Sequence, residues 1–202
     1  MLNRSSSRRI FLRTTLILPF FYKMKAYSVC TPTPTQPKGP FYKKIYDKSN
    51  NDMTNNGEAI GKKIKVYGNI FDSKCRTIPK AKIEIWQANS FGKYNHKKDL
   101  SKSKVDNNFN GYTKIHSNEK GEYFFFTVYP GHYKMSASSI RTPHIHFKIT
   151  TNNKSLTTQM YFKGNKMNES DYFYKKNIYN NGLEGILNSN QDLHSCEFNI
   201  II

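Results

Sequence analysis

The sequence predicts an all-β protein, built as a β-sandwich with long loops and minor helix. The chain contains 14 Tyr and 14 Phe although only 37% of its residues are hydrophobic, so aromatic side chains should supply much of the core. Short runs in which polar and apolar residues alternate recur along the chain, with turn residues between them at 118–121 and 130–131. Closely spaced strands of this kind are typical of a sandwich of two sheets.

The first strands are expected at 63–70 and 81–87, where polar and apolar residues alternate with a period of two. Residues 165–187 are less regular, and we expect a short helix or two there. The remaining strands are expected at 112–116, 121–127, 132–135, 144–150 and 156–162, with a closing strand at 196–202.

The strand at 81–87 shows how its residues divide between two faces. Ile83 and Ile85 share one face, whereas Glu84 and Trp86 share the other. We expect both isoleucines in the core. For the indole we favour cross-strand packing over a place in the lining of a pocket.

The chain is expected to form one domain, because 202 residues suffice for one well-packed domain or at most for one domain with an appendage. We assign 1–28 to a signal peptide, 29–60 to an extended N-terminal arm and loop, and 61–202 to the β-sandwich catalytic domain. The prolines and the glycine between 31 and 42 exclude a helix there. Residues 89–110 form a long polar loop, which a compact domain retains chiefly where the loop has a function.

Residues 1–28 resemble a twin-arginine export signal. The segment 7–13 reads Ser-Arg-Arg-Ile-Phe-Leu-Arg, and the apolar run at 14–22 is far too short to span a bilayer. Ala26 and Ser28 supply small residues at the spacing that a signal peptidase accepts. Two arginines can also precede an apolar patch by chance, but the Phe-Leu-Arg context favours export. We therefore expect a periplasmic or secreted protein without a stable membrane anchor.

The formal net charge is +18. Residues 1–28 hold six basic residues and no acidic one, so the rest of the chain carries 18 − 6 = +12. The lysines are scattered among Asn and Ser without a basic helix or an aromatic–basic stripe, and this argues against a nucleic-acid partner. A positive field of this kind would attract small aromatic anions.

Three cysteines, Cys30, Cys75 and Cys196, allow at most one disulfide in an oxidising compartment. They form no C-x-x-C metal pattern. The sequence leaves open which two of them would pair.

A His-x-His pair lies in the strand expected at 144–150. His144 and His146 alternate with Ile145 and Phe147, so both imidazoles should leave the same face of the strand. Two imidazoles on one rigid strand are half of a metal site. The alternative is that both are ordinary polar-face residues of an edge strand.

Two tyrosines decide between these interpretations. Tyr94 lies in the long loop and Tyr133 in a nearby strand. A phenol with its ordinary pKa near ~10 is seldom deprotonated at neutral pH unless a highly charged cation is bound to it. Two tyrosinates therefore argue for ferric iron, which imidazole nitrogen also suits.

These four residues belong to a series of ordered motifs at 35–42, 83–89, 92–96, 106–111, 130–133, 141–147 and 156–162. With these motifs the chain resembles the intradiol ring-cleavage dioxygenases, from about Gly39 to the C-terminus. Within that family it is most like the iron-bearing β subunits of protocatechuate 3,4-dioxygenases. The number and order of the motifs argue against coincidence.

The resemblance implies a β-sandwich of the intradiol dioxygenase type that acts on a catechol and O2. The product would be a cis,cis-muconate, and the catechol would be protocatechuate-like. A homo-oligomer, or a hetero-oligomer with a related subunit, is also expected. The implied ligands of a bound Fe(III) are Tyr94, Tyr133, His144 and His146.

Three residues receive catalytic roles from the same resemblance. Arg141 would place a fixed cation beside the substrate ring, where negative charge develops during the attack by oxygen. Gln159 would be a neutral hydrogen-bonding partner, and Tyr133 would take a proton from the catechol. Met135 stands where the family has an aromatic residue, so the ring-side pocket departs from the pattern.

Two other functions are compatible with parts of the sequence. An exported β-sandwich protein could bind iron or catechols without turnover, and it would differ from the enzyme only in that respect. A basic module that recognises nucleic acid would have no need of Tyr94 or Tyr133. The presence of the whole ligand set favours the dioxygenase.

Overall fold

The computed structural model describes residues 29–44, 50–136, 139–177, 182–189 and 194–202. The export signal predicted at 1–28 lies outside these residues. The strands are β1 (Lys63–Phe71), β2 (Lys82–Trp86), β3 (Tyr112–His116), β4 (Glu122–Val128), β5 (Tyr133–Lys134), β6 (Ile140–Arg141), β7 (His144–Thr150), β8 (Ser155–Phe162), β9 (Glu184–Ser189), β10 (His194–Glu197) and β11 (Ile200–Ile201). A 3₁₀ helix, η1 (Lys166–Ser170), and a short α1 (Tyr172–Lys175) complete the described elements, and the all-β class is confirmed.

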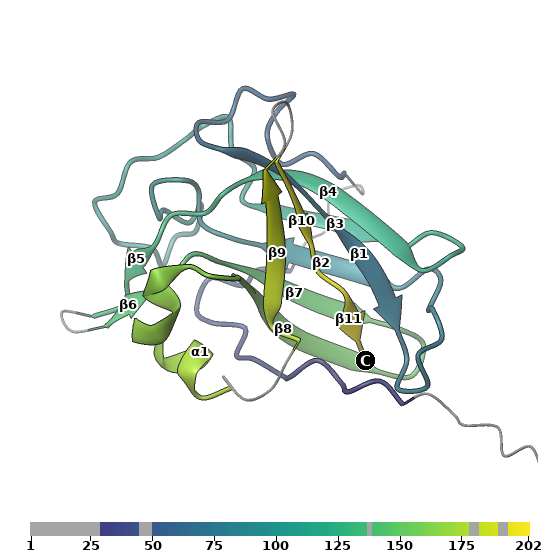
Figure 1. Cartoon of the computed structure of the whole chain (residues 1–202). Helices are drawn as coiled ribbons and strands as arrows, with labels where there is room; N and C mark the ends of the chain where they lie inside the picture. The colour runs from purple at the N-terminus through teal and green to yellow at the C-terminus, as the bar shows by residue number, and fades with distance from the viewer. Residues whose placement is uncertain (1–28, 45–49, 137–138, 178–181, 190–193) are drawn as a thin grey trace, which may run out of the picture.

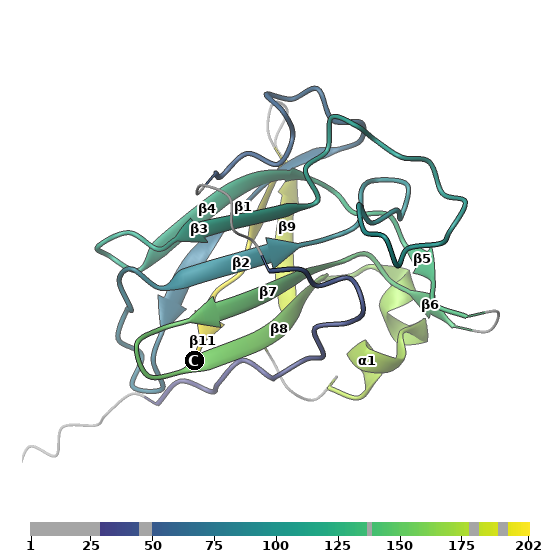
Figure 2. The same cartoon turned by 180° about the vertical axis from the view of Figure 1, so that it is seen from behind.

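The strands form two packed layers (Figures 1 and 2). One layer holds β4, β1, β10 and β11, and the other holds β3, β2, β7 and β8. β9 joins the two layers, because it pairs antiparallel with β10 and parallel with the end of β8. β5 and β6 form a separate hairpin beside them.

The core lies between the layers and follows the alternation of the strands. Ile64 and Val66 of β1 and Ile83 and Ile85 of β2 are fully buried in it, as the period-two pattern predicts. Aromatic rings fill the centre, and Phe147 of β7 contacts three of them with centroids between 5.3 and 6.2 Å. Burial of this apolar area favours the folded state by about 25 cal/mol per Å².

Two expectations about the C-terminal part need correction. The structure adds strand β9, which begins at Glu184 inside the region expected to be irregular. The closing strand expected at 196–202 is interrupted at Phe198 and Asn199, although β10 and β11 pair with β1 in one continuous register. The interruption arises because the side-chain oxygen of Asn199 accepts from Asn69 N (2.8 Å) in place of a backbone carbonyl.

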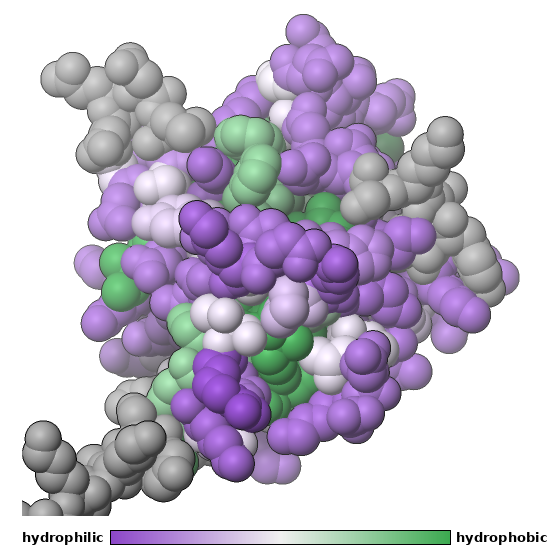
Figure 3. All heavy atoms as spheres, turned by 90° about the vertical axis from the view of Figure 1, so that its right-hand side faces the viewer, coloured by the Kyte–Doolittle hydropathy of each residue, from purple (hydrophilic) through white to green (hydrophobic). Residues whose placement is uncertain are grey.

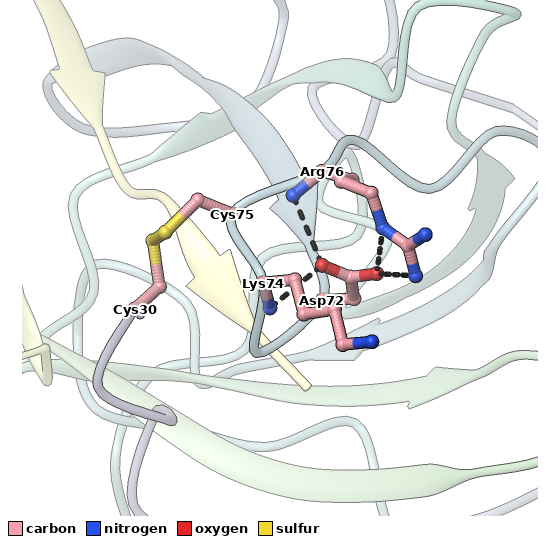
Figure 4. The surroundings of a disulfide bond; sticks show 5 residues. All are labelled: Cys30, Asp72, Lys74, Cys75 and Arg76. Carbon is pink, nitrogen blue, oxygen red and sulfur yellow. Dashed lines mark hydrogen bonds and ion pairs between the residues drawn. A yellow bond between two sulfur atoms is a disulfide. The ribbon is translucent and has the colours of Figure 1, made fainter. Parts of the chain in front are cut away.

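Residues 29–44 lie along β8 as an extended arm (Figure 2). Gln36 N donates to Thr157 O (2.9 Å), and the Thr158 hydroxyl donates to Pro34 O (2.8 Å). At its beginning the arm is tied to the loop after β1 by the Cys30–Cys75 disulfide (Figure 4). The arm therefore has a fixed path toward the end of the sandwich where the candidate ligands lie.

Hydrophilic residues dominate the face shown in Figure 3, which is the right-hand side of Figure 1, and apolar residues are exposed there in smaller patches. No helix in the described part of the chain is long and apolar enough to cross a membrane.

Candidate metal centre

Strand β7 supplies two imidazoles on the face opposite to the core. Ile145 and Phe147 are fully buried in the core, so His144 and His146 leave the other face, where each is only 2% exposed. This burial rules out the ordinary polar face of an edge strand, because β7 is flanked by β2 and β8. Gln159 of β8 lies directly beside His146 in the pairing.

The two imidazoles point toward one another, with their Nε2 atoms 3.2 Å apart. His144 Nδ1 donates to Thr142 O (2.6 Å), because a carbonyl can only accept. This bond leaves the lone pair of His144 on Nε2. Burial, followed by the nearby Arg141 cation, holds the pKa of both imidazoles well below its ordinary value, so both are neutral and can act as ligands.

Tyr94 and Tyr133 bring two phenols to the same place. Their rings are 5.4 Å apart and perpendicular, and the Tyr133 ring is 5.7 Å from that of His144. Tyr94 is 1% exposed, and its hydroxyl has no hydrogen-bond partner among the described residues. Burial raises the pKa of both phenols. Without a cation, both phenols therefore keep their protons.

The loop that carries Tyr94 is held by two side chains of its own. Asn89 Oδ1 accepts from Phe91 N (2.9 Å) and Lys93 N (3.0 Å) and so shapes the turn before Tyr94. Asp99 Oδ2 accepts from Tyr94 N (2.7 Å), and Asp99 Oδ1 lies 3.3 Å from the ammonium of Lys93. Hydrogen bonds within the loop therefore fix the position of the Tyr94 phenol.

Two glycines let this loop pack against the strand that carries Tyr133. Gly131 N donates to Asn89 O (2.9 Å), and a Cβ at Gly131 would lie 2.4 Å from Gly92 N. A Cβ at Gly92 would lie 2.2 Å from His132 O, and Gly92 has a φ of +77°. Only glycine allows both the close approach and this backbone conformation.

The four side chains fit a metal ion that binds nitrogen and anionic oxygen. Two nitrogens at right angles on an ion about 2.1 Å away would be about 3 Å apart, close to the observed Nε2 separation. The buried, unpartnered hydroxyl of Tyr94 is a second sign, since such a group costs free energy unless it gains a partner. All four residues named from the sequence, Tyr94, Tyr133, His144 and His146, come together in the structure.

Arg141 lies beside this centre in a buried network. Its Nε donates to Asp171 Oδ2 (2.8 Å) and its Nη2 donates to Gln159 Oε1 (2.6 Å). Burial alone would lower the pKa of Arg141, but its neighbours Tyr133 and Asp171 outweigh this effect, and the pKa is raised. The ion pair of Arg141 with Asp171 is not a surface pair, because the side chain of Arg141 is 4% exposed.

Asp171 is a functional residue that the sequence did not reveal. It is fully buried, accepts from Thr142 N (3.0 Å) and caps α1 by accepting from Phe173 N (2.9 Å). An aspartate before a short helix is a local signal for a cap. Its pairing with Arg141 joins positions 30 residues apart, and no local pattern indicates it.

Trp86 also contacts the centre. Its ring lies parallel to the His146 imidazole, with centroids 4.8 Å apart and planes 5° apart. β2 and β7 place these two residues opposite each other, so the indole does pack across strands as expected. The stack restricts the orientation of the imidazole.

A pocket of about 460 Å³ reaches the centre at Tyr133, and the arm supplies one of its walls. Phe41 of the arm stacks on Tyr94 with centroids 4.4 Å apart, and Pro37 O accepts from Gln159 Nε2 (2.7 Å). Two larger hollows lie elsewhere on the surface, and neither is lined by any of the four candidate ligands. The residues that line this pocket are Pro37, Gly39, Pro40, Phe41, Gly92, Lys98, Asp99, Leu100, Ser101, Tyr133, Lys134, Met135, Arg141, Gln159 and Phe173.

The model of a protein family described as Dioxygenase matches residues 38–199, which is most of the chain. The chain belongs to the intradiol ring-cleavage dioxygenase family. It is 31% identical over 154 residues to the β chain of protocatechuate 3,4-dioxygenase from Burkholderia cepacia, covering 66% of each chain. A putative dioxygenase from Rickettsia typhi is 31% identical over 141 residues, which cover 63% of this chain and 64% of that protein. The matches thus span slightly less than two thirds of these curated relatives.

Solved structures of the family share this fold. An intradiol ring-cleavage dioxygenase from Tetranychus urticae superposes with a TM-score of 0.69 at 22% identity, covering 86% of this chain and 94% of that one. The dioxygenase domain of a carbohydrate-binding fusion from Streptomyces sp. SirexAA-E gives 0.67 at 24% identity, covering 85% and 97%. At these identities the likeness concerns the fold, and it confirms the expected sandwich type.

Gly92→Ala should weaken metal binding in this intradiol-type site, whereas Gly164→Ala should not. Both glycines have a φ of +77°, so alanine is equally strained at the two positions, but no described atom lies within 4 Å of a Cβ at Gly164. Displacement of the Tyr94 loop should lower metal affinity by about 10–100-fold. Titration with iron, alongside circular dichroism, measures this. Equal affinities in the two variants would contradict the role of Gly92.

Asp171→Asn should lower the free energy of unfolding by about 3–5 kcal/mol, because it leaves the buried Arg141 cation without its counter-charge. Urea unfolding measures the loss. Glu119→Gln is the matched control, since it removes an ion pair with Lys80 whose side chains are both about three quarters exposed. A loss in Asp171→Asn no larger than in this control would show that the buried pair does not stabilise the site.

Proposed function

We propose that the chain is a non-haem Fe(III)-dependent dioxygenase that cleaves a catechol ring between its two hydroxylated carbons, with O2 as co-substrate and a cis,cis-muconate as product. The substrate class is a protocatechuate-like catechol. The observation that carries the proposal is the convergence of two neutral imidazoles and two phenols, one of which, Tyr133, lines a 460 Å³ pocket together with Arg141. Membership of the intradiol family supports the same reaction.

The ligand set supports ferric iron. Two phenols with raised pKa values lose their protons only to a strongly polarising cation, and oxygen anions suit a trivalent ion. When bound, the ion would hold the catechol as a dianion and make its ring reactive toward O2. Tyr94, Tyr133, His144 and His146 would hold this ion.

The residues around the pocket would position the substrate and balance its charge. Of the two protons that the catechol would lose on binding, one would pass to Tyr133 Oη and the other to a hydroxide that leaves as water, which keeps this poorly solvated site neutral. Arg141 lines the pocket, and its cation would stabilise negative charge that develops on the ring during attack. Gln159 is fixed at both ends, by Arg141 and by Pro37 O, so its amide gives the arginine a defined orientation.

The first test is made on the purified chain loaded with iron. The protein should be wine-red, its colour should shift when a catechol is added, and oxygen uptake should follow. With ¹⁸O2, mass spectrometry should find both labelled atoms in the muconate. A coloured protein that consumes no oxygen with a panel of catechols would favour binding without turnover, and a colourless iron-loaded protein would refute the ligand assignment. We also propose a homo-oligomer, or a hetero-oligomer with a related subunit, and light scattering on the same sample tests for it.

Two variants separate the ligand roles in that experiment. Tyr133→Phe should retain part of its iron but bind catechol poorly, whereas His146→Ala should lose the metal. Tyr67→Phe, a phenol of β1 in the other layer, is the control and should match the unmodified protein. Unchanged activity in both site variants would refute the assigned roles.

We also propose export through the twin-arginine route, and the Cys30–Cys75 disulfide supports an oxidising destination. Replacing Arg8 and Arg9 by lysine should retain the protein in the cytoplasm. Thiol alkylation after denaturation should then label all three cysteines, against only Cys196 in the exported protein. Unaltered export of the double variant would refute the proposed route.

A further inference from the structure

The pocket above the candidate centre is larger than one catechol ring requires. Its volume of about 460 Å³ lies within the range of about 300–1,000 Å³ found for ligands of drug size. The inner end is formed by Tyr133, Arg141 and Gln159, and half-buried Phe41 and Phe173 form walls further out. A substituent on the ring would therefore extend between these walls toward the mouth.

The mouth carries two exposed apolar side chains. Leu100 is 88% exposed and Met135 is 52% exposed, and both line the same pocket. A single exposed apolar residue needs no explanation, but two at the mouth of one cavity offer a surface for an apolar group. Each belongs to a segment that also carries a candidate ligand, because Met135 follows Tyr133 by two residues and Leu100 follows the aspartate that holds the Tyr94 loop.

Charge at the mouth is also unbalanced. Of the charged residues that line the pocket, Arg141 is paired with Asp171, and Asp99 is occupied by backbone N–H groups and by Lys93. Lys98 and Lys134 remain, both exposed. Their ammonium groups have no hydrogen-bond or ion-pair partner among the described residues.

We propose that the pocket selects catechols whose ring carries a short apolar chain ending in a carboxylate, with the chain against Leu100 and Met135 and the carboxylate near Lys98 and Lys134. This inference rests on the proposed ring cleavage and specifies its substrate class. A carboxylate attached directly to the ring would lie among the apolar walls, away from both lysines. A purely apolar substituent would leave the two cations without a partner.

Four catechols test the proposal on the iron-loaded protein: unsubstituted catechol, protocatechuate, 4-propylcatechol and 3-(3,4-dihydroxyphenyl)propanoate. The propanoate should have the highest kcat/KM. We expect about tenfold over protocatechuate, since one methylene in an apolar pocket is worth at least about that much. Over 4-propylcatechol we expect about threefold at low salt, falling toward one at high salt, because an exposed ion pair is weak and screened.

Two variants locate the effect. The double variant Lys98→Met, Lys134→Met should lose the preference for the propanoate over 4-propylcatechol, so that the ratio of the two substrates falls to about one. This should hold both for kcat/KM and for the dissociation constants measured from the catechol-induced colour change. Met135→Ser should instead lower the ratio of propanoate to protocatechuate by about threefold or more. Lys120→Met, in the turn before β4, is the control and should preserve both ratios.

The outcomes separate this inference from the proposed function. Failure of all four catechols to consume oxygen would overturn the ring-cleavage function and the inference with it. Turnover of catechol with protocatechuate or 4-propylcatechol as good as the propanoate at low salt would overturn the inference alone. A ratio of propanoate to 4-propylcatechol that survives the double lysine substitution at low salt would likewise overturn it, because the carboxylate would then be recognised elsewhere.

Discussion

The two faces of β7 are the constraint on which the rest of the structure depends. Its inward residues Ile145, Phe147 and Ile149 are fully buried in the core, which fixes the register of the strand between β2 and β8. A slip by one residue would put both imidazoles into the core and the apolar side chains into the metal centre. The apolar packing on one side therefore holds His144 and His146 in place on the other.

The same arrangement of β7 also removes the candidate ligands from water. Tyr94, His144 and His146 are buried as neutral groups, Tyr133 is half-buried beside them, and the hydroxyl of Tyr94 has no partner among the described residues. Such a group costs about 1–3 kcal/mol in the folded state. An ion that binds only the folded chain offsets this cost and stabilises the fold by mass action. The free energy lost by burying the unpartnered hydroxyl is therefore regained when the ion binds.

How much could be predicted from the sequence depended on whether the signal was local. Alternation alone gave the bounds of β7 and the common face of its histidines, and the same rule placed Ile83 and Ile85 in the core. Tyr94 lies in a loop without periodicity, so only the resemblance to a family connected it with the site. Strand β9 was not predicted, because its six residues include glycine and asparagine and show no alternation of polar and apolar residues. It is stabilised by pairing with β8 and β10.

The parts of the site that sequence reasoning missed share a physical cause. Asp171 matters through a buried pair with Arg141, and Phe41 matters through a stack on Tyr94, so each acts across a large separation in the chain. The candidate metal centre depends mainly on residues of hydrogen-bonded strands, whereas the pocket mouth comes from loop and hairpin residues such as Leu100 and Met135. Since the mouth contributes no candidate ligand, its residues can change with little disturbance to the strands. Substrate choice can therefore vary in this fold while the chemistry at β7 stays the same.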